Sequence, residues 1–133
     1  MAIEKGVAAH ADFEKVEWIA EPKDDFERAL AKPDGLTALW REKPFEVFAD
    51  GAWVSGRFDR VVFADGRATI LDFKTNAIRR GESVADFEAR MRETYAGQMR
   101  AYHAAVCALT GLMPDKVSAK LLLTSTRRVV DVI

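Results

Sequence analysis

Two Asp-Gly dipeptides, Asp50-Gly51 and Asp65-Gly66, constrain the fold of this chain more than any other feature. Asp-Gly is the strongest short signal for a two-residue hairpin turn, because both positions accept positive φ angles. The dipeptides separate three runs of strand-forming residues, at 44–49, 52–63 and 67–74. The sequence therefore predicts an antiparallel three-stranded meander.

Helical patterns stand on both sides of the meander. Apolar residues at i, i+4, i+7 and i+11 predict a helix over residues 6–20, and a shorter helix is predicted over 24–32. After the meander, Ser83 opens a long helix, with Asp86 three residues later as an approximate capping box. Gly111 ends this helix in the C′ position.

Two further strands are predicted at residues 117–124 and 128–132. The connection from the third strand through a long helix to the next strand indicates a crossover onto a parallel neighbour. The order is α(α)βββαββ, so the predicted fold class is α+β, with a central mixed β-sheet flanked by helices.

The composition of the chain excludes several classes of protein. The 133 residues are expected to form a single domain over residues 1–133, with no transmembrane span and no secretory signal. Twenty basic and twenty-one acidic residues leave a charge of −1, so nothing in the bulk charge favours nucleic acid. Cys107, the single cysteine, cannot form an internal disulfide or a four-cysteine cluster, and a reducing, cytoplasmic setting is expected.

The third strand carries a carboxylate and an ammonium group. Strand alternation places Asp72 and Lys74 on one face and Leu71 and Phe73 on the other. Such groups are costly to desolvate unless they have a partner or a task. An ordinary ion pair at a sheet edge is the simpler interpretation.

Asp59 lies within the preceding strand, where a carboxylate is disfavoured. It could pair with Arg57 or Arg60. If the hairpin register instead brings it to the face of Asp72 and Lys74, two carboxylates and one lysine converge. That arrangement suits a hard divalent cation such as Mg²⁺.

Three polar residues on the predicted helices are further candidates. His10 lies beside the apolar stripe of the first helix, with Glu14 and Glu17 on its face; a lone helix histidine is more often a packing residue than a ligand. Gln98 and Tyr102 lie at i and i+4 inside the apolar stripe of the long helix. A buried glutamine needs a polar partner.

In order, these features resemble one known family. They are His10 on a leading helix, followed by Glu42-x-Pro44-Phe45, Gly56-x-x-Asp59-Arg60, Asp72-Phe73-Lys74-Thr75 and Gln98-x-x-x-Tyr102. Together they resemble the RecB-type nuclease domain of the PD-(D/E)xK superfamily, found at the C-terminus of bacterial helicase–nucleases such as RecB and AddA. The resemblance runs from Gly6 to the last residue and implies a restriction-endonuclease-like fold.

The resemblance also implies roles. His10, Asp59, Asp72 and the backbone carbonyl of Phe73 would bind a catalytic Mg²⁺ or Mn²⁺. Asp59, Asp72 and Lys74 would form the catalytic set, with Lys74 orienting or deprotonating the attacking water. DNA-binding residues would be Gln98, Tyr102, Arg79 and Arg80, although solvated loop arginines are an equally good interpretation of the last two.

The function that follows is a metal-dependent deoxyribonuclease, exonuclease rather than endonuclease, acting in recombination or repair on single-stranded DNA or duplex ends. The chain would be a domain of a longer helicase–nuclease, its partner a helicase motor domain or subunit, with no membrane contact. Neither an iron–sulfur cluster nor a nucleotide is expected, since the cysteines and a phosphate-binding loop are lacking.

One alternative is an inactive nuclease fold that binds DNA or serves as a scaffold. The other is a protein-binding domain, in which Asp59 and Asp72 would point to different faces.

Overall fold

A computed structural model describes residues 18–49 and 51–133, which form a mixed sheet with helices on both faces. The α+β fold predicted from the sequence is confirmed. None of the described helices is long and apolar enough to cross a bilayer. The elements are α2 (Asp25–Ala29), β1 (Leu36–Ala49), β2 (Ala52–Ala64), β3 (Arg67–Lys74), α3 (Val84–Thr110), the 3₁₀ turn η2 (Pro114–Lys116), β4 (Val117–Leu123) and β5 (Arg128–Asp131).

The sheet has the order β1-β2-β3-β4-β5. Its pairs are antiparallel except β3–β4, which is parallel and is connected by α3, so the predicted crossover is confirmed. Two residues separate the paired ends of each predicted hairpin, Ala49 from Ala52 and Ala64 from Arg67. In the second turn, Asp65 and Gly66 both have positive φ, as a type I′ turn requires.

Helix α3 has the ends that the sequence predicts. The Ser83 side chain accepts a hydrogen bond from the Asp86 amide, and Gly111 adopts the left-handed conformation at φ 77°. Helix α2 is shorter than predicted, because Leu30 already leaves helical geometry. The helix predicted over residues 6–20 lies mostly outside the described residues, and its last three positions, 18–20, are not helical.

Strand β1 is the largest departure from the prediction, since it begins at Leu36 rather than Pro44. Proline lacks a backbone N–H and therefore suggests a strand start. Here β1 is the outermost strand of the sheet, where a residue without a donor is tolerated in mid-strand.

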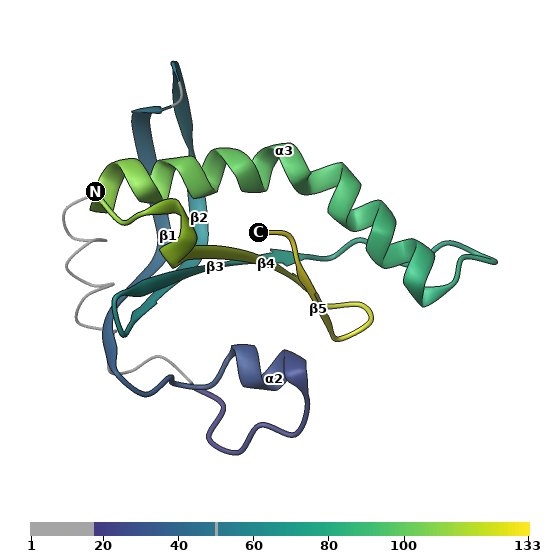
Figure 1. The fold of residues 1–133 in the computed structure, drawn as a ribbon. Coiled ribbons are helices and arrows are strands. Elements are labelled where there is room, and N and C mark those ends of the chain that lie inside the picture. Colours follow the sequence, from purple (N-terminus) through teal and green to yellow (C-terminus); the bar gives the residue numbers. More distant parts are fainter. Residues whose placement is uncertain (1–17, 50) are drawn as a thin grey trace.

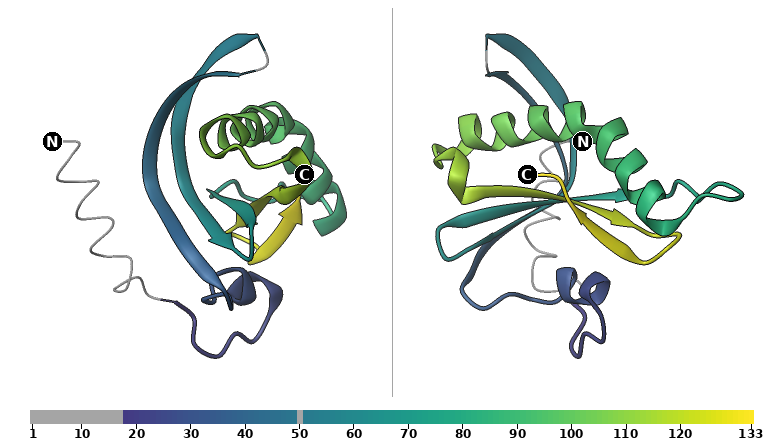
Figure 2. Two further views of the ribbon diagram at one scale, coloured as in Figure 1. Left: turned by 60° about the vertical axis from the view of Figure 1, so that its left-hand side comes forward. Right: turned by 45° about the vertical axis from the view of Figure 1, so that its right-hand side comes forward.

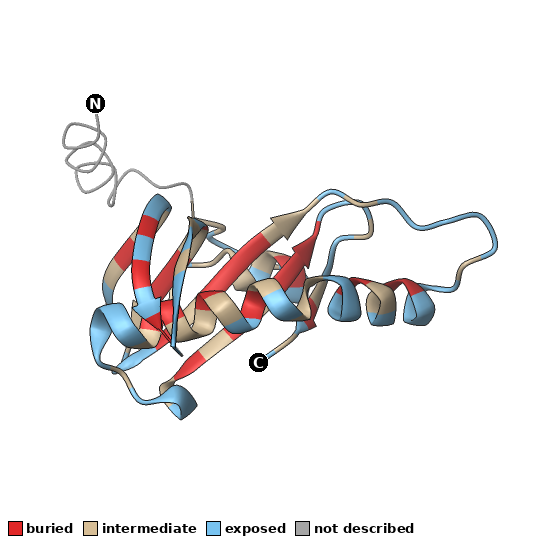
Figure 3. Cartoon of the chain, turned by 90° about the horizontal axis from the view of Figure 1, so that it is seen from above, coloured by how far each residue is buried: buried red, intermediate tan, exposed pale blue. Residues whose placement is uncertain are grey.

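The two faces of the sheet bury separate cores. Helix α3 covers one face, and its buried side lies against the strands while its other side is exposed (Figures 1 and 3). The opposite face carries a smaller cluster around α2, formed by Phe26, Leu39, Val62, Leu71 and Leu122. The site described below belongs to the α3 face.

The β1–β2 hairpin changes its inward face part-way along its length. Near the sheet, Trp40 and Val61 pack toward the α3 core; farther out, Phe45 and Phe58 do so, which shifts the alternation by one residue in both strands. The change occurs around Glu42, whose φ is 46°. Beyond this point the hairpin curves around α3 (Figure 2).

Candidate active site

Asp72 and Lys74 lie at the end of β3, on the face covered by α3. Asp72 is 3% exposed and is the one buried charged residue in the described part of the chain. Lys74 Nζ lies 2.8 Å from Asp72 Oδ2. Ile70, on the same face, belongs to the α3 core, whereas Leu71 and Phe73 pack on the opposite face. The predicted alternation along β3 is therefore confirmed.

Asp59 lies where β2 separates from β3. The last paired residues of the two strands are Arg60 and Leu71, so Asp59 is the first residue beyond the ladder. Its Oδ2 accepts a hydrogen bond of 2.9 Å from the backbone amide of Phe73. The Asp59 side chain thus takes the place of the backbone hydrogen bond that β2 no longer makes once it diverges from β3. The new hydrogen bond holds the Asp59 carboxylate beside Asp72.

The ion-pair alternatives for Asp59 are not what the structure shows. Arg57 Nη1 lies 4.0 Å from Glu42 Oε1, and the Arg60 guanidinium lies 5.9 Å from the ring centres of both Trp18 and Phe73. The Asp59 carboxylate instead lies near enough to Asp72 to raise the pKa of its carboxyl, which contradicts the alternative in which the two side chains point to different faces.

Burial raises the pKa of the Asp72 carboxyl from its usual 3.8 to about 6; nearby Lys74 opposes the rise, and the Asp59 carboxylate adds to it. Asp72 Oδ2 is buried and accepts no hydrogen bond. The Lys74 ammonium, 2.8 Å from Oδ2, pairs with it in charge. A buried carboxylate oxygen in this state is available to a cation.

Helix α3 positions the Lys74 side chain. Lys74 Nζ donates a 2.9 Å hydrogen bond to Gln98 Oε1, and Gln98 Nε2 lies 3.3 Å from the hydroxyl of Tyr102. Gln98 is half-buried rather than buried, and the structure gives it the polar partners that the sequence required. It brings Gln98 and Tyr102 to the side of the site formed by Lys74.

Tyr95 is a member of this site that the sequence did not single out. Lys74 Nζ lies 4.1 Å from the centre of its ring, a cation–π contact, and its hydroxyl donates to Asn76 Oδ1 at 3.0 Å. Tyr95 precedes Gln98 by three residues and so shares its helix face. That spacing was visible in the sequence, but there it indicated only the apolar stripe.

The remaining predicted site residues, Arg79, Arg80 and His10, have no described contact with Asp59, Asp72 or Lys74. Arg79 and Arg80 are exposed in the loop between β3 and α3, where the Arg79 amide donates to Glu82 Oε1. His10 lies outside the described residues. Within residues 18–49 and 51–133, no third His, Cys, Asp or Glu joins Asp59 and Asp72 to complete a metal-binding group.

Gly56 allows the outer hairpin to approach the site helix. A Cβ at this position would lie 3.1 Å from Tyr102 Cε1 and 3.2 Å from the Phe45 ring. The Phe45 ring stacks on that of Phe58, with centroids 4.3 Å apart, and both meet the Tyr102 ring edge-on. The rings of Tyr102 and Phe45 therefore cannot easily move away from a side chain added at Gly56.

Replacing Gly56 by alanine should destabilise the fold by about 1–2 kcal/mol, because the added methyl overpacks this aromatic cluster. Denaturant unfolding monitored by fluorescence measures the change. Gly97→Ala is the matched control, since the nearest heavy atom to its Cβ would be a flexible arginine end at 3.9 Å. Equal stability of the two variants would contradict the close approach at Gly56.

Comparison with known proteins decides the family. The model of the PD-(D/E)XK nuclease superfamily matches residues 3–131 of the chain. The chain belongs to this superfamily. It is also similar to an ATP-dependent helicase/nuclease subunit of Oenococcus oeni, with 26% identity over 160 residues. That alignment covers 89% of this chain but 13% of the relative, so the chain spans a small part of that protein's length.

PD-(D/E)XK nucleases generally use divalent metals, and the residues of this member fit such an ion. Asp59 and Asp72 supply carboxylate oxygens, the ligands that hard divalent cations prefer, and the Asp59 charge is near enough to raise the pKa of Asp72. One of these oxygens is buried without a hydrogen bond. The two like charges repel each other, and a cation between them would remove that cost.

Proposed function

We propose that this nuclease hydrolyses phosphodiester bonds of DNA with a Mg²⁺ or Mn²⁺ held by Asp59, Asp72, the backbone carbonyl of Phe73 and His10. The observation that carries the proposal is the buried Asp72 beside Asp59 and Lys74 at the end of β3. A bound divalent cation would lower the pKa of a water molecule and neutralise negative charge on the phosphate.

Lys74 is the group that would act on the attacking water. Its ammonium is held at 2.8 Å from Asp72 and 2.9 Å from Gln98, so its position is fixed before substrate arrives. As the ammonium it would orient the water and offset the negative charge that develops on the phosphate, whereas only as the neutral amine could it take the proton of that water. Tyr95 and Gln98 serve as positioning residues, because they act through Lys74.

DNA is the proposed substrate, as single strands or accessible duplex ends, and exonucleolytic cleavage in recombination or repair is the proposed activity. Gln98 and Tyr102 on α3, together with Arg79 and Arg80 in the preceding loop, would contact the backbone of the bound strand. The helicase/nuclease name of the Oenococcus oeni relative supports a further proposal, that this nuclease works with a helicase motor, either within a longer chain or in a complex of separate chains.

Thermal unfolding in increasing Mg²⁺ or Mn²⁺ tests the site without relying on cleavage. An ion bound only by the folded chain adds about 2.7 kcal/mol at one hundred times its dissociation constant, which should raise the melting temperature by at least about 5 °C. Asp59→Asn should remove most of this rise. Asp131→Asn is the matched control, because Asp131 pairs with Lys120 on the exposed surface.

An inactive nuclease fold would give no ion-dependent shift and no cleavage of linear DNA. An ion-dependent shift without cleavage would leave the metal site standing and reject the nuclease activity. The cost of keeping Asp72 charged and buried favours an active site, because a site without a ligand gains nothing from it.

A further inference from the structure

A cavity of about 280 Å³ lies between α2 and the sheet, on the face that α3 does not cover (Figure 1). Its floor is apolar, because Val62 and Leu71 belong to the smaller core cluster on that face. The short side chains of Ala29 and Ala31 form part of its wall. Small-molecule sites in proteins occupy about 300–1,000 Å³, so this cavity has room for one small ligand.

Three basic side chains line the cavity: Arg28 on α2, Arg67 at the start of β3 and Lys120 on β4. No Asp or Glu of the described residues lines it. Lys120 is the direct β4 partner of Leu71, which places the ammonium group on the face of the apolar floor. Cations of one sign around a wall of low dielectric raise the local concentration of anions.

The contacts that the structure gives these cations leave them able to bind an anion. Arg28 Nη1 lies 2.6 Å from Asp25, and Lys120 Nζ lies 2.6 Å from Asp131, but both carboxylates are largely exposed. Exposed pairs of this kind contribute little free energy, so a ligand can compete for the cations. Arg67 forms no ion pair with any described residue and donates to a backbone carbonyl at 3.3 Å.

The chemistry of the lining indicates the kind of anion. Guanidinium groups match the oxygens of a phosphate in a two-point geometry. The apolar floor and the small side chains of the wall suit a flat ring. Thr69, the β3 partner of Val62, adds a hydroxyl that can donate to or accept from a sugar or a base edge. A phosphate joined to a flat ring through a sugar is a nucleotide.

We infer that this cavity binds a nucleoside monophosphate, with its phosphate at Arg67 and Lys120 and its base over Val62 and Leu71. A monophosphate fits the observations better than a triphosphate, since the chain lacks the phosphate-binding loop that a triphosphate would use. The cavity lies on the other face of the sheet from Asp72, so binding there requires neither the proposed metal nor cleavage of DNA.

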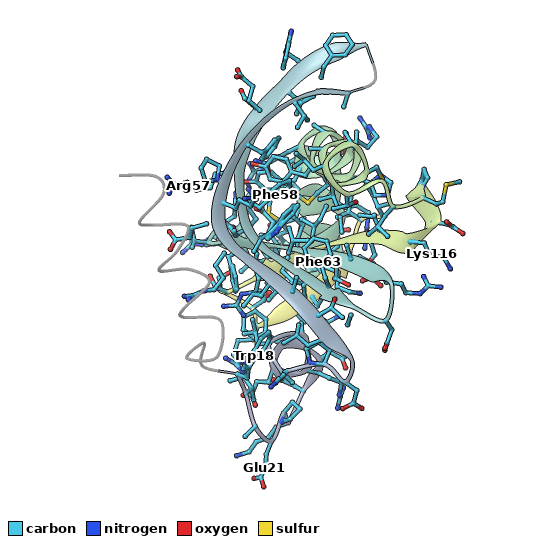
Figure 4. All side chains as sticks on the ribbon, turned by 90° about the vertical axis from the view of Figure 1, so that its left-hand side faces the viewer. Trp18, Glu21, Arg57, Phe58, Phe63 and Lys116 are labelled. Atoms are coloured by element: carbon cyan, nitrogen blue, oxygen red, sulfur yellow. The ribbon has the colours of Figure 1, made fainter. Side chains whose placement is uncertain are left out.

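Calorimetric titration of the chain with deoxyadenosine monophosphate, in the presence of a chelator, measures this binding. Arg67→Gln and Lys120→Gln should each weaken it by at least about tenfold, because each removes one charge-assisted contact with the phosphate. Deoxyadenosine and inorganic phosphate, each lacking one half of the ligand, should also bind at least about tenfold more weakly. Arg57→Gln is the matched control, because Figure 4 shows this exposed arginine on the outer hairpin, away from α2.

The inference is wrong if deoxyadenosine monophosphate does not bind, or if inorganic phosphate binds as tightly as the nucleotide. It is also wrong if Arg67→Gln and Lys120→Gln weaken the binding of a single-stranded oligonucleotide and leave that of the nucleotide unchanged, since these cations would then contact DNA. Nucleotide binding by a chain that cleaves no DNA would support the inference and count only against the proposed function. The two failures are thus distinguishable.

Discussion

Replacing Asp72 by asparagine should lower DNA cleavage by at least about 10³-fold while it makes the folded chain more stable at neutral pH. Activity is lost because asparagine supplies no negative charge to a divalent cation. Stability rises because the carboxylate is buried at 3% exposure and its pKa is raised to about 6. Because Lys74 loses its carboxylate partner in the variant, the net gain at pH 7 is about 1–2 kcal/mol.

The pH dependence follows from the same shift. Below about pH 4, Asp72 is protonated in both the folded and the unfolded chain and contributes no difference. Between the usual pKa of 3.8 and the folded pKa of about 6, the unfolded chain releases this proton while the folded chain retains it. Stability therefore falls as pH rises through this window and stays lower above it.

Urea unfolding at pH 4, 5, 6 and 7 in the presence of a chelator measures this difference. The original chain and Asp72→Asn should have similar free energies of unfolding at pH 4, and these should diverge by pH 7. Added Mg²⁺ should raise the free energy of unfolding of the original chain only. Asp131→Asn controls for the loss of an exposed carboxylate that pairs with a lysine. An Asp72→Asn chain that is less stable at pH 7 would show that the charge is already satisfied without a metal.

Replacing Lys74 by methionine should lower the turnover number by about 10²–10³-fold and leave the ion-dependent rise in melting temperature in place. Methionine matches most of the length and packing of lysine but has no charge or proton to exchange. The carboxylates of Asp59 and Asp72 remain, so the cation should still bind and still stabilise the fold. Lys74 would then serve the chemical step and Asp72 the binding of the metal, although their charged groups lie 2.8 Å apart.

Turnover and melting temperature, measured on the same preparations, check this separation. Lys120→Met is the matched control, since Lys120 forms the same kind of pair with Asp131 on the surface. If Lys74→Met loses the ion response as well, Lys74 holds the site together and has no separate part in the chemistry. If it cleaves DNA normally, the proposed role of Lys74 is wrong.

Much of the fold was predictable because its signals are local. The Asp-Gly turns, the Ser83 cap and the Gly111 terminus each depend on the conformational preferences of one or two residues. The alternation of Ile70, Asp72 and Lys74 along β3 was also confirmed, because this strand pairs with β4 without interruption from Ala68 to Lys74.

The site was predictable only in part, because its geometry depends on contacts between distant segments. A run of alternating residues could not show that β2 separates from β3 at Asp59, nor that a backbone amide, rather than an arginine, would hold the Asp59 carboxylate. The change of face near Glu42 likewise interrupts the strand period that the prediction assumed. Tyr95 was missed for another reason: its hydroxyl partner, Asn76, lies in a loop whose path the sequence does not specify.

The close approach at Gly56 has a mechanical consequence. Phe45 and Phe58 of the outer hairpin press on Tyr102, which lies beside Gln98, and Gln98 holds Lys74. The tip of the same hairpin displays Phe48 and Trp53, exposed by 59% and 70%. A displacement of the hairpin at Phe45 and Phe58 would therefore reach the Lys74 ammonium through Tyr102 and Gln98, and the exposed aromatic tip lies at the far end of the same two strands.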